Sequence, residues 1–162
     1  MNVQDLRPEK HLTVVTLALG AQTLAVPAGM LREILDPLPV TRVPGAGPYV
    51  PGVVNVRGSV VPLADLKHAL SIPDEGHDHR RRIMVLEVQL LGEAATVAIQ
   101  ADAVHEVTTV DAAVIETLPS TANAWPPEFL TGLYRGANGF VLLPNLTQIF
   151  STLATRPQAA TL

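Results

Sequence analysis

Short runs of apolar, often β-branched residues fill most of the chain, and glycine or proline separates them, which is typical of β-strands. Three pairs of these runs predict hairpins, over residues 12–26, 53–63 and 83–99. A further apolar run over 103–110 continues the β pattern, and 30–35 is a short apolar stretch with two charges facing away. The pattern therefore predicts a mainly β fold.

Two segments without regular alternation interrupt the strands and are expected to be loops. Five prolines between residues 37 and 51 predict an extended loop, because proline fixes φ and donates no backbone hydrogen bond. The polar segment 71–82 predicts a second loop. Residues 64–70 are compatible with a short helix, since Leu66 and Leu70 lie four positions apart and share a face.

An internal repeat decides the expected architecture. Residues 52–66 (GVVNVRGSVVPLADL) align without a gap onto residues 132–146 (GLYRGANGFVLLPNL), 80 positions later, and residues 26–34 fall on residues 99–107. Each half then holds about five strands and a closing helix. Because five short strands do not easily expose two open edges, each half is expected to curl into a small barrel, with the pair packed through apolar faces.

The repeated hairpins carry different turn signals. Gly58-Ser59 separates the runs of the first hairpin, and glycine at the first central position suits a type II′ turn. Asn138-Gly139 occupies the matching place in the second hairpin and is a strong type I′ signal. We therefore expect one hairpin geometry built with two turn chemistries.

Composition narrows the function classes. Hydrophobic residues make up 48% of the 162 residues and charged residues only 16%, which argues for a filled core and against disorder. The net charge of −4 has the wrong sign for nucleic-acid binding. The polar N-terminus and the absence of a run of roughly 18 to 20 apolar residues predict a soluble, cytoplasmic chain that does not insert into membranes.

Catalytic chemistry finds little support in the residues. The chain has no cysteine and no G-x-S-x-G elbow, which leaves no nucleophile beside a base. His105 lies in an apolar run and is interpreted as an outward strand residue, and Asp65 at a helix start is interpreted as a cap. Nothing in the sequence brings Asp65 and Asp102 together as an acid-base pair, so we predict a protein without catalytic residues or cofactors.

One polar loop leaves a metal site open as an alternative. His77 and His79 are spaced so that two imidazoles could approach each other, with Asp74, Glu75 and Asp78 nearby. An acidic, histidine-bearing loop is more often simply solvated, so we predict no metal site there and keep a small metal-dependent enzyme as a minor hypothesis.

Asn55 and Arg57 are the most unusual residues of the first hairpin, because they are polar and cationic in an otherwise apolar segment. Strand alternation would place them on an exposed face, opposite Val54 and Val56, without any binding role. Ala137 replaces Arg57 in the repeat, so barrel geometry does not require arginine there. A binding role and a plain exposed face both remain open from residue chemistry alone.

The chain resembles the CheW-like family of chemotaxis coupling proteins over nearly all of residues 12–153. Residues 49–66 (YVPGVVNVRGSVVPLADL) carry the family's Gly-x-x-Asn-x-Arg-Gly and Pro-x-x-Asp-Leu pattern. Supporting matches are Leu19-Gly20, Arg32-Glu33-Ile34, residues 97–104 and Leu130-Thr131-Gly132. Asn145, where the family often has aspartate, Ala98, where glycine is usual, and the loop at 45–48 depart from the pattern.

The resemblance implies a fold and a domain plan. The fold is two five-stranded SH3-like barrels related by pseudo-symmetry, with short helices closing each. Residues 12–154 would form a single domain of two intertwined barrels, between a flexible N-terminus (1–11) and a flexible tail (155–162).

The resemblance also implies an adaptor function. Such proteins have no active site and couple methyl-accepting chemoreceptors to a CheA-like histidine kinase, in receptor arrays that they join through protein contacts. By carry-over, Asn55, Arg57 and Gly58 would contact the receptor's cytoplasmic hairpin tip, and Leu31 and Glu33 the kinase's regulatory domain. A small-molecule or peptide sensor, using the groove between the barrels, is the alternative.

Overall fold

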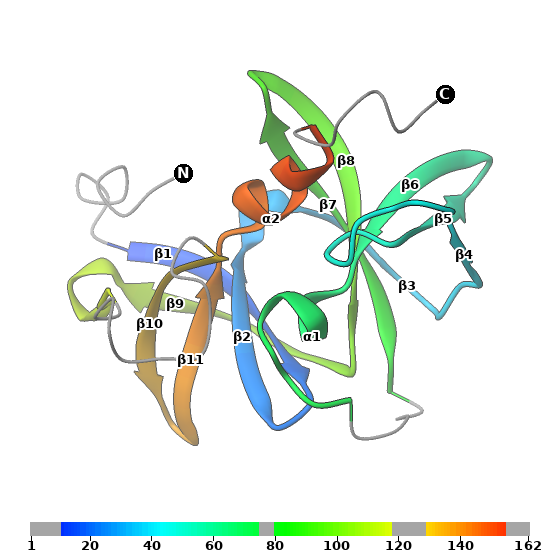
Figure 1. Ribbon diagram of the computed structural model, residues 1–162. Helices are drawn as coiled ribbons and strands as arrows, with labels where there is room; N and C mark the ends of the chain where they lie inside the picture. The colour runs from blue at the N-terminus through cyan, green and yellow to red at the C-terminus, as the bar shows by residue number, and fades with distance from the viewer. Residues whose placement is uncertain (1–10, 75–79, 118–128, 155–162) are drawn as a thin grey trace.

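The computed structural model describes residues 11–74, 80–117 and 129–154, which form two β-sheets and a few short helices (Figure 1). The strands are β1 (His11–Leu19), β2 (Gln22–Pro27), β3 (Leu31–Leu35), β4 (Val40–Arg42), β5 (Gly52–Val56), β6 (Ser59–Ala64), β7 (Arg82–Leu90), β8 (Glu93–Ala101), β9 (Ala103–Asp111), β10 (Leu130–Gly136) and β11 (Gly139–Pro144). The helices are α1 (Leu66–Ala69) and α2 (Leu146–Ala154), with 3-10 turns η2 (Ala28–Met30) and η3 (Ala112–Val114). The mainly β prediction is confirmed.

The two sheets exchange strands between the halves of the chain. One sheet has the order β3-β7-β8-β6-β5-β4, and we call it the first barrel; the other has the order β10-β11-β2-β1-β9, and we call it the second barrel. The first barrel therefore has six strands rather than the predicted five. The extra strand is β4, inside the proline-rich segment, where Val40, Thr41 and Arg42 pair with β5.

The strand exchange follows one rule in both halves. The β1–β2 hairpin turns at Gly20-Ala21 and the β7–β8 hairpin at Leu91-Gly92, and the strand after each hairpin crosses to the other barrel. There β3 pairs with β7, Leu31 opposite Leu86, and β9 pairs with β1, Val104 opposite Leu17. Glu33 lies two residues after Leu31, and Glu106 lies two residues after Val104. The two glutamates therefore occupy equivalent positions in β3 and β9.

The repeat of 80 positions is exact in the main-chain hydrogen bonds. The amide of Asp65 donates to the carbonyl oxygen of Tyr49 at 2.8 Å, and the amide of Asn145 donates to that of Phe129 at 2.9 Å. Asp65 and Asn145 each accept the amide of the third residue onward, His68 and Gln148, at 3.1 Å. Asp65 is thus a helix cap, as predicted.

Three apolar clusters hold the fold together. One fills the first barrel, around Val54 and Val61, and one fills the second, around Tyr134 and Val141. The largest lies between the barrels and joins β1, β2, β7 and β8 to both helices; Phe150 of α2 is fully buried in it. A shared core of this kind makes the two barrels one packed unit.

Both predicted turn geometries are wrong. In the first hairpin Val56 pairs with Ser59, so the turn residues are Arg57 and Gly58, with φ of 50° and 88°, the sign pattern of type I′ rather than type II′. In the second, Gly136 pairs with Gly139, and neither turn residue between them has a positive φ among the described residues; Gly139 itself has φ 124°. The two central residues of each turn therefore lie one position earlier in the sequence than the glycine pattern indicated.

Some predictions fall outside the described residues. The loop with His77 and His79 and the segments 1–10 and 155–162 are among them. Within the described residues no helix is long and apolar enough to cross a membrane.

Candidate interaction surface on the first barrel

The β5–β6 hairpin presents three of the predicted binding residues at its tip. Val54 and Val56 are buried while Asn55, Arg57 and Gly58 are exposed, so the predicted alternation is confirmed along β5. The Asn55 side chain accepts the amide of Gly58 at 2.7 Å, which fixes the tip locally. This hydrogen bond explains why the turn is centred on Arg57 and Gly58. A type I′ turn at these residues leaves the Gly58 amide without a main-chain partner, and Asn55 accepts it.

Arg57 forms a bidentate ion pair with Glu33 of β3. Its two terminal nitrogens donate to the two carboxylate oxygens, with 2.8 Å between Nη1 and Oε1. The hydrogen bonds from Arg57 hold the pKa of Glu33 below its usual value and, reciprocally, raise the pKa of Arg57. The structure therefore brings together two residues that the resemblance assigned to different partners.

The ion pair lies at the surface rather than in the core. The side chain of Arg57 is 68% exposed and that of Glu33 is 29% exposed, so solvent screens the pair and its net stabilisation is small. Its consequence is positional, because it ties the hairpin tip to the edge strand β3. Leu31, the other predicted kinase contact, is half-buried and packs against the core between the barrels.

The sequence interpretation missed an apolar neighbour of this tip. Val60 lies directly across from Asn55 in the β5–β6 ladder and is 72% exposed. Ile34, next to Glu33 on β3, is also exposed. The tip surface, which we define as Ile34, Glu33, Asn55, Arg57 and Val60, thus combines apolar side chains with one charge pair. The in-and-out alternation of side chains along residues 59–61 was the sequence signal that could have predicted the exposure of Val60.

A second candidate is the polar pocket beside α1, which has a volume of about 250 Å³. Lys67 lies in it and contacts Asp74 at 2.9 Å and Asp102 at 3.1 Å, and Asp102 also accepts the amide of Gly20 at 2.7 Å. Burial alone would lower the pKa of Lys67, but the hydrogen bonds from its ammonium to the two carboxylates raise it. Asp65 lines the same pocket and accepts the amide of His68 as the cap of α1, whereas Asp102 holds Lys67 and the amide of Gly20.

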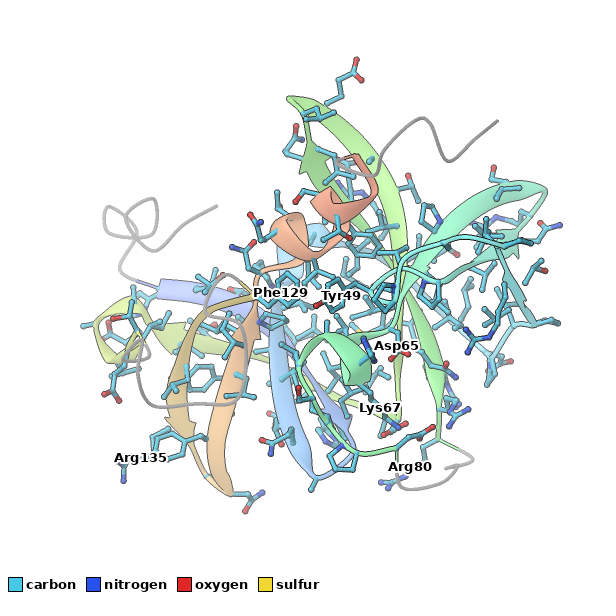
Figure 2. The ribbon with its side chains drawn as sticks, viewed as in Figure 1. Tyr49, Asp65, Lys67, Arg80, Phe129 and Arg135 are labelled. Carbon is cyan, nitrogen blue, oxygen red and sulfur yellow. The ribbon has the colours of Figure 1, made fainter. Side chains whose placement is uncertain are left out.

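Aromatic rings mark the seam between the barrels. Tyr49 and Phe129, related by the 80-residue repeat, meet edge to face with ring centroids 4.9 Å apart (Figure 2). His68 also contacts Tyr49, with the two rings tilted and their centroids 5.6 Å apart. The described residues contain no group of histidine and acidic side chains that could hold a metal ion. Phe129 and His68 thus both pack against Tyr49 at the seam. His105, in contrast, is exposed on β9, as predicted.

Comparison with known proteins agrees with this geometry. The family model described as the CheW-like domain matches residues 13–154. The chain is 30% identical to the chemotaxis protein CheW of Rhizobium meliloti, over 87% of this chain and 92% of the relative. It is 28% identical to the probable chemotaxis protein CheW of Rhizobium etli, over 85% and 86% respectively.

The fold also has a counterpart among solved structures. The crystal structure of the scaffolding protein TtCheW from Thermoanaerobacter tengcongensis superposes with a TM-score of 0.75. The match covers 86% of this chain and 87% of the other, at 24% identity. At this identity the likeness supports the arrangement of the two barrels.

Proposed function

This chain belongs to the CheW-like family, and from that premise we propose that it is a non-enzymatic adaptor in a chemosensory array. Its partners are methyl-accepting chemoreceptors and a CheA-like histidine kinase, which it couples by binding both. The observation that carries the proposal is the tip surface, where the Arg57–Glu33 pair joins two strands on an exposed face.

The receptor contact in this proposal uses Asn55, Arg57 and Gly58. The Asn55–Gly58 hydrogen bond and the Glu33 carboxylate hold the tip in one conformation, which lowers the entropy lost on binding. Val60 adds exposed apolar area beside the charge, the combination that lets a modest interface bury surface and fix orientation. The cytoplasmic hairpin tip of a receptor is the proposed occupant.

The kinase contact uses Leu31 and Glu33 on β3 and is proposed to involve the regulatory domain of the kinase. Because β3 is the edge of its sheet, a partner can approach it from the open side. The two contacts meet at the Arg57–Glu33 pair. Loss of the pair is therefore expected to change both interactions, by unequal amounts.

Receptor co-sedimentation tests the proposal. Arg57→Ala should weaken binding to receptor-bearing membranes about tenfold or more, which is roughly 1.4 kcal/mol and typical of an interface arginine. The matched control is Arg32→Ala, which removes an exposed arginine paired with Glu87 at 3.1 Å and lies outside the proposed receptor contact. Thermal unfolding of both variants checks that the fold is retained, as Ala137 at the equivalent place suggests.

Glu33→Gln separates the two contacts. It breaks the ion pair but keeps Arg57, so kinase binding should fall more than receptor binding, measured with the purified kinase regulatory domain. Unchanged receptor co-sedimentation of Arg57→Ala would remove the receptor role from the tip.

The pocket beside α1 gives little support to the sensor hypothesis. The pocket beside α1, at about 250 Å³, is below the roughly 300 to 1,000 Å³ typical of ligand sites. Its central charges, Lys67 and Asp102, already pair with each other. The geometry therefore favours the adaptor.

A further inference from the structure

A cleft of about 770 Å³ opens in the second barrel, between β9 and the tip of the β10–β11 hairpin. Thr16, Glu106, Tyr134 and Arg135 are among the residues that line it. In the sheet order, β9 and β10 are the two ends, with β1, β2 and β11 between them, and Figure 1 shows these two ends near each other. The cleft is thus the place where the second barrel does not close through a strand ladder.

The cleft occupies the position that the Arg57–Glu33 pair occupies in the first barrel. Glu106 is the equivalent of Glu33 by strand register, and Ala137 is the equivalent of Arg57 by the 80-residue repeat. Alanine cannot reach across, and among the described residues no side chain forms an ion pair or hydrogen bond with the Glu106 carboxylate. The second barrel therefore keeps the acceptor of this pair and lacks the donor.

Tyr134 provides an independent sign that the cleft is built for a polar group. It stands where the first barrel has Val54, which is fully apolar, and it is only 6% exposed. Its hydroxyl has no hydrogen-bond partner among the described residues. Burial and the nearby Glu106 carboxylate raise the pKa of Tyr134, so the group stays a neutral phenol. Because Tyr134 lines the cleft, its hydroxyl can form a hydrogen bond with a ligand there.

The other charged residues of the cleft are already directed elsewhere or exposed. Arg135 lies over the ring of Phe140, with its guanidinium carbon 5.1 Å from the ring centroid. Asp111 accepts the amide of Ala113 at 2.9 Å and caps η3. His105 is exposed on β9. Glu106 remains the charge available to a ligand.

The edge strand β9 points to a protein rather than a small ion as the ligand. Val107, next to Glu106 on β9, is 64% exposed and adds apolar surface along this strand. In addition, β9 ends its sheet, with β1 as its one neighbour among the described strands, and an edge strand can pair with an extended segment. A free cation would use neither feature.

We propose that this cleft binds an arginine side chain carried by an extended segment of a partner protein. The guanidinium would donate to the Glu106 carboxylate, as Arg57 does to Glu33 within the first barrel, and one further N–H would donate to the hydroxyl oxygen of Tyr134. Arginine fits better than lysine because its planar fork matches a carboxylate with two parallel hydrogen bonds.

A peptide titration of the full chain tests the proposal. The probe is acetyl-Val-Arg-Val-amide, and its control is the same peptide with citrulline, which keeps the shape of arginine but not the charge. Amide chemical shifts of β9 and of the β10–β11 tip should change saturably with the arginine peptide, and the citrulline peptide should bind at least about fivefold more weakly. Free arginine should also bind more weakly than the peptide, because it lacks the apolar flanks.

Two variants and a matched control assign the contact. Glu106→Gln should weaken the arginine peptide at least about fivefold, and Tyr134→Phe about two- to fivefold. Glu33→Gln, in the first barrel, should leave peptide binding unchanged.

Three results would overturn the proposal: no saturable shift in β9, equal binding of the citrulline peptide, or full binding by Glu106→Gln. Equal affinity of free arginine would assign the cleft to a small cation instead. If the unliganded chain formed a concentration-dependent dimer and Glu106→Gln abolished it, the cleft would be assigned to a second copy of this chain rather than to a distinct partner.

Discussion

The two repeated hairpins, β5–β6 and β10–β11, share their bases and differ at their tips. At the base, Gly52 and Gly132 each face a backbone carbonyl oxygen of the neighbouring segment, and a cap residue begins the helix that follows. At the tip, Arg57 reaches across to Glu33, whereas Ala137 reaches nothing. The positions that repeat at the bases are those the fold needs, whereas the tip positions Arg57 and Ala137, which differ, are both exposed.

Substitutions at the bases of the two hairpins should have the largest effect on stability. A Cβ at Gly52 would lie 2.7 Å from the carbonyl oxygen of Thr41, and one at Gly132 would lie 2.7 Å from that of Glu116. Because backbone must shift in either case, Gly52→Ala and Gly132→Ala should each lower the free energy of unfolding by about 2 kcal/mol. Urea denaturation measures the loss.

Gly29→Ala is the matched control, since an added Cβ there has no neighbour within 4 Å, and it should change stability little. If Gly132→Ala were as mild as Gly29→Ala while Gly52→Ala were not, the two bases would not be energetically equivalent and the comparison would fail.

The helices give the second contrast. Lys67 of α1 connects the first barrel to Asp102 and, through it, to Gly20 at the turn of β1–β2, whereas its repeat equivalent in α2 is Thr147. Lys67→Met should lower the free energy of unfolding by about 2 kcal/mol, because Asp102 loses its cation. This value lies between those typical of exposed and of buried ion pairs. Thr147→Met, the control, should cost clearly less.

The pH dependence of this link has a definite sign. The folded-state pKa of Lys67 is raised above its unfolded value, so its contribution is complete below the unfolded pKa and is lost as pH rises through the folded pKa. The stability advantage of the wild type over Lys67→Met should therefore hold at neutral pH and shrink above about pH 10.5. Urea denaturation of both proteins along an alkaline series measures it, and an advantage independent of pH would contradict the assignment.

Local pattern was enough to predict most of the strands, the repeat and the cap at Asp65, because each depends on neighbours in the sequence. The Arg57–Glu33 pair could not be predicted, since it depends on β3 crossing to the other barrel before it meets the tip. The turn frames were wrong because a side chain, Asn55, determines the first one.

The strand β4 was missed for a related reason. Prolines surround it, but a close approach at Gly52 lets three residues pair with β5. The cleft of the second barrel is also invisible in the sequence, because Glu106 and Tyr134 meet only through the sheet order. In both cases the decisive contact joins segments far apart in the chain.

The tips give the smallest expected effect on stability and the sharpest test of the comparison. Replacing Ala137-Asn138-Gly139 by Arg-Gly-Ser copies the first tip into the second, where the new arginine can pair with Glu106 as Arg57 pairs with Glu33. An exposed ion pair changes stability little, so the denaturation midpoint should move only slightly. Binding of the arginine peptide should nevertheless be lost, because the chain now supplies its own guanidinium. The control Gln-Gly-Ser, with the same turn and no charge, should retain binding; if both variants retained it, the tips would not be interchangeable and the equivalence of Glu33 and Glu106 would be limited to the backbone.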